Sequence, residues 1–251
     1  MKPISIQMWT LRDEAKKDLK NVLKRLADIG YKAIEPAGFY GMSAEEYKKL
    51  VNSYGLEISS SHTPWASLEN IDEVVKTLDL FGLDIAAAGF GRDNFKDMDA
   101  VKKTTDTINA IQEKLEKAGK KLFLHNHAWE FETLNGKINH HYVAEMCPKV
   151  FFEIDTYWAT NFGTVNVANE LKYFGKRVIL LHIKDGSFVQ GEANVAVGSG
   201  KMNFKSIVDA VDKSSLRWMV VEFDSCATDI FKAVEESYSY LTKNKFAIGN
   251  K

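Results

Sequence analysis

Three observations in the sequence predict an α/β fold, a single (β/α)8 TIM barrel. Short apolar runs alternate with amphipathic runs along the whole chain, and eight of each can be counted. Successive parallel strands need a crossover between them, so eight repeats favour a closed barrel. The turn after the first strand, Trp9-Thr10-Leu11-Arg12, has no glycine, which disfavours a dinucleotide-binding open sheet. Barrels commonly reach 251 residues as one domain, so residues 1–251 are expected to form a single domain.

Apolar runs in the first part of the chain predict four strands, at 4–8, 33–36, 57–61 and 84–88. After the first strand, apolar residues recur at helical spacing over 19–29 until Gly30 stops the pattern. Ser43 and Glu46 form a capping box that opens a helix reaching residue 54, and Gly55 closes it. A third helix is expected from about residue 70 until Gly82 ends it.

The rest of the chain repeats the alternation. Strands are expected at 122–127, 151–155, 178–182 and 218–223. Helices are expected at 98–118, 142–146, 165–174, 204–211 and 230–241. The run Val178-Ile-Leu-Leu-His182 is bounded by glycines and indicates a strand buried on both faces. Because side chains alternate along a strand, Leu180, His182 and Lys184 share one face.

Polar and aromatic side chains recur at the ends of the predicted strands, where the active sites of barrels lie. In chain order these are Gln7, Trp9, Glu35, His62, Trp65, Arg92, His125, Asn126, His127, Glu130, Asp155, Trp158, His182, Lys184, Glu222 and Asp224. Carboxylates mixed with imidazole suit Mn²⁺, Mg²⁺, Co²⁺ or Zn²⁺. By contrast, His140 and His141 begin a polar helix and are expected to face solvent.

Net charge, apolar runs and cysteine spacing indicate which partners and surroundings are expected. The formal net charge is -1, so no nucleic acid or other polyanion is expected as a partner. No apolar run is long enough to span a bilayer, and the two cysteines, Cys147 and Cys226, lack metal-type spacing. The first residues lack the apolar block of a secretory signal, so we expect a cytoplasmic protein, or an exported one if a leader was removed. The sequence is compatible with a monomer and with a homo-oligomer.

Four segments resemble the sugar phosphate isomerase/epimerase family of the xylose-isomerase-like barrel superfamily. They are Leu124–Phe131, Glu153–Trp158, Leu181–Asp185 and Val221–Asp224. The resemblance implies one divalent metal ion (Mn²⁺, Co²⁺, Mg²⁺ or Zn²⁺) held by four residues, Glu130, Asp155, His182 and Glu222. The superfamily's usual glutamate within strand five is missing, since Phe123 and His125 occupy the inward positions. His127 is the substitute for Glu130 as the fourth ligand.

The resemblance also implies a chemistry and further roles. A carboxylate base removes a proton beside the carbonyl of a keto-sugar and gives an enediolate, with Glu130 and Glu222 as the two bases. Lys184 is a proton donor or hydroxyl binder, or it bridges to Asp155 or Glu222. Substrate contacts are expected from Trp9, Glu35, His62, His127 and Trp158.

Three other functions remain in view. Lyases of the same fold, of the keto-inositol dehydratase or 3-keto-glycoside eliminase type, use the same enediolate. An endonuclease IV-like DNA repair enzyme would need more metal ligands and a basic face, which this sequence lacks. Retention of Asp155, His182 and Glu222 disfavours a non-catalytic sugar-binding module.

The loop that follows the strand ending near residue 182 contains two features of interest. Asp185 is expected to cap this loop. Gly198-Ser-Gly200 resembles a phosphate cradle only weakly, and a tight turn before a helix capped by Asn203 is favoured.

Overall fold

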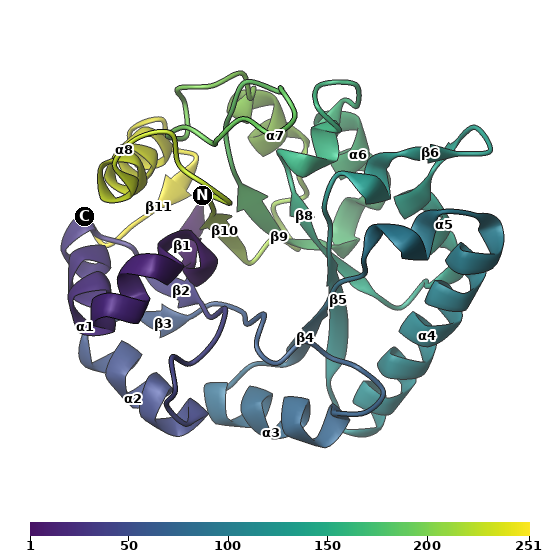
Figure 1. Ribbon diagram of the computed structural model, residues 1–251, viewed down its shortest axis with the longest axis horizontal. Coiled ribbons are helices and arrows are strands. Elements are labelled where there is room, and N and C mark those ends of the chain that lie inside the picture. Colours follow the sequence, from purple (N-terminus) through teal and green to yellow (C-terminus); the bar gives the residue numbers. More distant parts are fainter.

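Eight short parallel strands and eight helices alternate along the chain, as the apolar pattern predicts, in a computed structural model that describes residues 1–251 (Figure 1). The barrel strands are β1 (Lys2–Gln7), β2 (Ala33–Glu35), β3 (Glu57–Ile58), β4 (Ile85–Ala88), β5 (Lys121–His125), β8 (Phe151–Asp155), β9 (Val178–Ile183) and β10 (Trp218–Val221). The helices are α1 (Arg12–Ile29), α2 (Ala44–Ser53), α3 (Ile71–Phe81), α4 (Met98–Lys117), α5 (Asn139–Met146), α6 (Val167–Phe174), α7 (Phe204–Ala210) and α8 (Ile230–Lys243).

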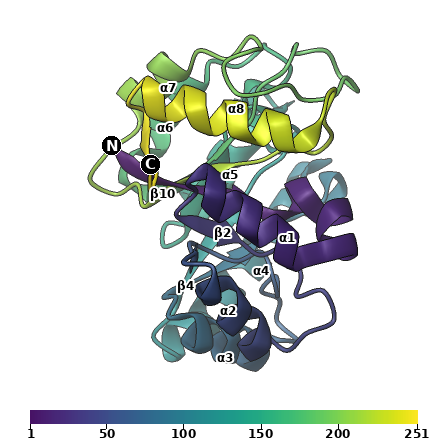
Figure 2. The same cartoon turned by 90° about the vertical axis from the view of Figure 1, so that its left-hand side faces the viewer.

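The strands pair in the order β3-β2-β1-β10-β9-β8-β5-β4, and every pair is parallel. A backbone hydrogen bond of 2.8 Å from Ala66 N, after β3, to Ala87 O of β4 joins the two ends of this path. A short last strand, β11 (Ala247–Ile248), pairs with β1, so both termini lie on the same side of the barrel (Figure 2). None of the helices has the length and apolar character needed to cross a bilayer.

Local signals end the helices where the sequence predicts. Gly30 and Gly82 adopt left-handed backbone angles, φ 116° and φ 77°, and end α1 and α3. The predicted capping box is present at the start of α2, where the Ser43 hydroxyl accepts from Glu46 N and the Glu46 carboxylate accepts from Ser43 N. These terminal bonds satisfy backbone groups that a helix leaves unpaired.

The barrel interior is divided into two parts. A main core of 55 buried residues packs the helices onto the strands. Inside the barrel, a small apolar cluster is built from Ile85, Ala87, Phe123, Ile179 and Leu180, early in their strands. His125 and His182 follow later in β5 and β9, and all six residues of β9 are buried. The barrel therefore closes its amino-terminal half with apolar side chains and carries its ionisable groups in the other half.

Candidate active site

Ionisable side chains from opposite sides of the barrel converge on His182 of β9. Its Nδ1 lies 2.6 Å from Glu222 Oε2, and its Nε2 lies 2.7 Å from Glu35 Oε1. A third carboxylate oxygen, Glu153 Oε1, lies 3.2 Å from Nε2. Burial alone would lower the pKa of His182, but the carboxylates of Glu153, Glu222 and Glu35 outweigh it and raise the pKa well above its ordinary value. A carboxylate therefore lies against each of the two ring nitrogens of His182.

Glu153, in the middle of β8, is a site residue that the sequence analysis did not single out. Its Oε2 lies 2.6 Å from His62 Nε2 and 3.2 Å from His125 Nδ1. Burial would raise the pKa of this carboxyl, but His182 and His62 hold it well below its ordinary value. A signal was present, since Glu153 and Asp155 have the same strand parity in an otherwise apolar run.

Glu35 lies beneath His182 and is fully buried. Gln7 Nε2 donates to its Oε1 at 2.6 Å, and the Ser60 hydroxyl donates to its Oε2. His62, predicted as a substrate contact, lies 3.4 Å from the same Oε1. Glu35 therefore contacts His182 directly, and its predicted contact with substrate stays a prediction.

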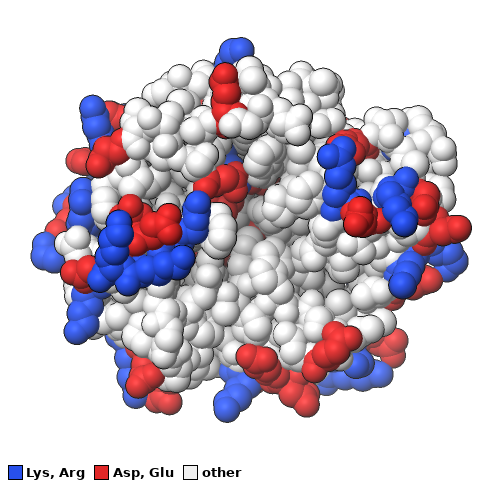
Figure 3. All heavy atoms as spheres, in the orientation of Figure 1, with Lys and Arg blue, Asp and Glu red and all other residues white.

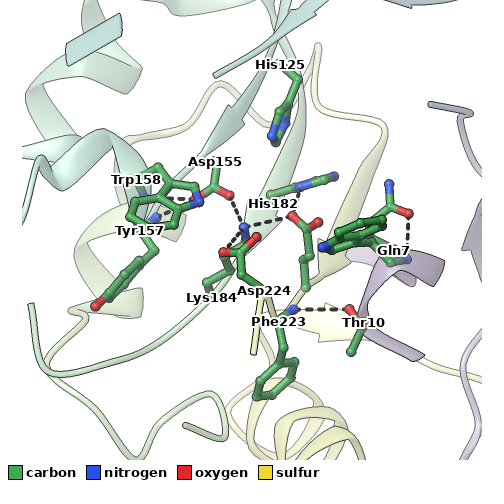
Figure 4. A network of polar contacts seen from close by, with 12 residues as sticks. Gln7, Thr10, His125, Asp155, Tyr157, Trp158, His182, Lys184, Phe223 and Asp224 are labelled. Carbon is green, nitrogen blue, oxygen red and sulfur yellow. Dashed lines mark hydrogen bonds and ion pairs between the residues drawn. The ribbon is translucent and has the colours of Figure 1, made fainter. Parts of the chain in front are cut away.

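Lys184 lies among three carboxylates and is buried (Figure 4). Its Nζ is 2.9 Å from Asp155 Oδ2, 3.0 Å from Glu222 Oε2 and 2.7 Å from Asp224 Oδ2. Burial would lower the pKa of Lys184, but these carboxylates raise it well above its ordinary value. The ammonium also lies 5.5 Å from the ring centroid of Trp158. Of the two predicted alternatives, bridging is present, and Lys184 bridges Asp155 and Glu222 at once.

Two overlapping groups of side chains have the geometry to hold a cation. One is His62, His125, Glu153 and His182; the other is His125, Asp155, His182 and Glu222. Within each group the ligand atoms lie within 4.8 Å of one another, and all the residues are buried. Asp155 Oδ2 pairs with the Lys184 ammonium at 2.9 Å, and burial raises the pKa of the Asp155 carboxyl to about 6. A buried donor set of imidazole nitrogens and carboxylate oxygens fits a divalent cation.

Glu130 belongs to neither group. It follows β5 in a short 3-10 turn, η3 (Trp129–Phe131), and its Oε2 accepts from His127 N at 2.8 Å. Burial raises the pKa of Glu130 to about 8. The His127 ring stacks on Trp129, with centroids 4.2 Å apart, and burial lowers its pKa to about 4. Beside the predicted ligands Asp155, His182 and Glu222, the second group contains His125, so ligation by Glu130 or by His127 stays a prediction.

Aromatic side chains lie around the charged groups. Trp9 and Trp65 are 46% and 39% exposed, and Trp158 is half-buried. The Trp65 ring lies 4.4 Å from the His62 ring, which ties it to the site. In Figure 3 most charged side chains lie toward the outside of the molecule, and the middle of this face is hollowed, with charged side chains on one edge of the hollow. By contrast, Arg92 is exposed and pairs with Glu132 at 2.6 Å, so it does not join the site.

The expectation that His140 faces solvent is wrong. His140 is buried among the rings of Phe131, Phe152 and Phe174, and neither ring nitrogen has a hydrogen-bond partner. Burial lowers its pKa to about 3. The helix α5 packs this position against β8, which its polar sequence does not reveal. His141 is also largely covered and pairs with Glu170 at 2.6 Å.

The site is thus a buried cluster of carboxylates and imidazoles inside a closed parallel barrel. A sequence profile of xylose isomerase-like TIM barrels matches residues 23–243, and the chain belongs to this family. No curated protein sequence matches the chain.

Solved structures share this fold. A sugar phosphate isomerase/epimerase from Parabacteroides distasonis is 25% identical, with a TM-score of 0.80 over 98% of this chain and 96% of that one. An L-ribulose 3-epimerase is 17% identical, with a TM-score of 0.72 over 97% and 94%. A probable 3-DHS dehydratase from Bacillus anthracis is 11% identical, with a TM-score of 0.72 over 96% and 99%.

Proposed function

We propose that the protein is a divalent-metal-dependent isomerase or epimerase of a keto-sugar or sugar derivative, working through an enediolate. The observation that carries the proposal is the second cation-competent group, which four barrel strands, β5, β8, β9 and β10, deliver to one point. The likeness to structures named as isomerase/epimerase and epimerase supports the same reaction class.

His125, Asp155, His182 and Glu222 would hold the cation, with Glu130 as the alternative that the family resemblance implies. A divalent cation bound there would polarise the substrate carbonyl and stabilise the negative charge that develops on its oxygen. The residues around it would supply the acid–base chemistry and the orientation of the sugar.

Glu222 is the proposed base. Burial would raise the pKa of its carboxyl, but Lys184 and His182 outweigh burial and hold it well below its ordinary value, so it is ionised at neutral pH. Both neighbours contact Oε2, at 3.0 Å and 2.6 Å, which leaves Oε1 to accept a proton from the carbon beside the carbonyl. Lys184 holds the carboxylate in place, and it would also be the proton donor or hydroxyl binder that the resemblance implies.

The remaining roles follow from position. Trp9 and Trp158 would present flat apolar faces to the sugar ring, and His62 and His127 would contact its hydroxyls. Glu130, protonated at neutral pH because burial raises its pKa to about 8, is the candidate second acid–base group that the resemblance implies. Glu35 would act through His182, which it contacts directly.

A lyase is the second candidate, favoured by one contact. The Lys184 ammonium lies beside the proposed base, at 3.0 Å from Glu222 Oε2, and can protonate a β-leaving group after the proton has been removed. The fold shared with a probable dehydratase is compatible with this outcome.

Solvent exchange tests the proposal. The Mn²⁺-treated protein is incubated in deuterated water with a panel of ketoses and keto-glycosides, and the sugars are followed by NMR. An isomerase or epimerase should place deuterium in the product beside the carbonyl, and a lyase should yield an unsaturated product. Conversion of no panel member, with no exchange and no effect of a chelator, would contradict the proposal.

A further inference from the structure

Substrate charge can be inferred from the loops after β9 and β10, the seventh and eighth barrel strands. Barrels that bind phosphorylated substrates often hold the phosphate with backbone amides from these two loops and a helix N-terminus. Whether such amides are available in this chain decides whether the proposed sugar enzyme can hold a phosphate there. The inference rests on the proposed function and defines its substrate further.

The amides of the β9–α7 loop already bind an anion, the carboxylate of Asp185. Its Oδ1 accepts from Gly186 N at 2.9 Å and from Met202 N at 3.1 Å. Its Oδ2 accepts from Gly198 N at 2.9 Å and from Gly200 N at 3.0 Å. Asp185 is buried, and a Cβ at Gly200 would overlap its carboxylate. The Gly198-Ser-Gly200 turn therefore closes around a side chain of the chain itself, and its amides are not available to a substrate phosphate.

The helix N-termini on this rim are also occupied. The α7 cap residue, Asn203, accepts from Ser206 N at 3.1 Å through its side chain. The α8 cap residue, Asp229, accepts from Lys232 N at 2.8 Å and brings a further negative charge. At each helix start, a side chain of the chain itself therefore already accepts from one of the free backbone N–H groups.

The cations near the mouth are engaged as well. Lys184 pairs with three carboxylates. Arg12 donates to the carbonyl oxygens of Trp9 and Asp224, at 2.7 Å and 2.9 Å, and its guanidinium lies 4.4 Å from the Trp9 ring centroid. Lys201, exposed on the β9–α7 loop, is the remaining cation there and would act as a single mobile charge.

Carboxylates dominate the interior instead. Those of Glu35, Glu153, Asp155, Glu222 and Asp224 all lie in contact with His182 or Lys184. A phosphate entering this region would meet like charges, which costs binding free energy. The exposed faces of Trp9 and Trp65 suit an uncharged sugar ring. We propose that the substrate is an unphosphorylated ketose or keto-glycoside and that Asp185 fills the phosphate position of this barrel.

Binding and melting experiments test this without any turnover. Inorganic phosphate is titrated into the full-length protein by calorimetry, with and without a chelator and against KCl at matched ionic strength. No saturable binding is expected. Saturable binding that persists with the chelator and is lost in Lys201→Ala would overturn the proposal.

A matched pair of variants tests the role of Asp185. Asp185→Asn turns an amide NH₂ toward backbone N–H groups, so the melting temperature should fall by roughly 5 °C or more. Glu192→Gln neutralises an exposed carboxylate on the same loop, and its melting temperature should stay within about 1 °C of the wild-type value. Equal melting temperatures for the two variants would contradict the assignment. Because neither readout uses activity, their failure is distinguishable from failure of the proposed reaction.

Discussion

Lys184 Nζ lies 3.0 Å from Glu222 Oε2, so an ammonium after β9 is in direct contact with the proposed base after β10. The same ammonium lies 2.9 Å from Asp155 Oδ2. Asp155 and Glu222, two of the proposed cation ligands, therefore both contact the positively charged side chain of Lys184. The contact links the stability of the barrel to the reactivity of its site.

Lys184→Met should test this link. Loss of the ammonium leaves three carboxylates close together without a cation, and breaking a buried ion pair typically costs about 3–5 kcal/mol of unfolding free energy. Added Mn²⁺ should then raise the melting temperature of Lys184→Met more than that of the wild type, because the cation offsets the same carboxylates. Lys201→Met, which removes an exposed lysine, is the control. An equal response of all three proteins to Mn²⁺ would refute the shared role.

Glu222→Gln should keep the fold and lose turnover. The amide is nearly the same shape and can still accept from Lys184, but it cannot take a proton. We expect a loss of roughly 10²–10⁴-fold, the usual contribution of a positioned general base. Asp224→Asn changes the more exposed partner of Lys184 and should lose less activity. Undiminished turnover in Glu222→Gln, measured by NMR, would exclude Glu222 as the base.

His140 should make the protein less stable as the pH falls. In the unfolded chain a histidine takes up a proton near pH 6.5, whereas burial lowers the pKa of folded His140 to about 3. Below about pH 6.5 the unfolded state binds more protons, so the unfolding free energy falls by up to about 1.4 kcal/mol per pH unit. His140→Phe, in its aromatic surroundings, should reduce this slope. Urea unfolding at several pH values between about 7 and 5 measures it, and an identical slope in the variant would count against the buried neutral imidazole.

Local sequence signals were enough for the elements and for part of the site. Gly30 and the Ser43 capping box act through bonds within a few residues, so they can be recognised without the fold. Strand alternation places His182 and Lys184 on one face, and in the structure both contact the carboxylate of Glu222. Asp185 was expected to cap its loop, and it does so with four backbone amides.

Contacts between distant strands could not be predicted in the same way. The partner of Glu153, His62, is 91 residues away along the chain, and their meeting depends on how the barrel curves. Glu130 lies outside the two cation-competent groups because the turn η3 directs its carboxylate back to the His127 backbone. His140 was misplaced because burial of a polar helix start is decided by the neighbouring strand, not by its own sequence.

Calorimetric titration of Mn²⁺ tests the central claim, a cation site built from His125, Asp155, His182 and Glu222, most directly. Wild type should bind about one Mn²⁺ per chain. His125→Ala should weaken binding by more than the roughly 10–100-fold expected for loss of an outer-shell partner, whereas Glu130→Gln should bind nearly as well as wild type. Absence of stoichiometric Mn²⁺ binding in the wild type would contradict the account. So would a result in which Glu130→Gln loses Mn²⁺ binding and His125→Ala keeps it.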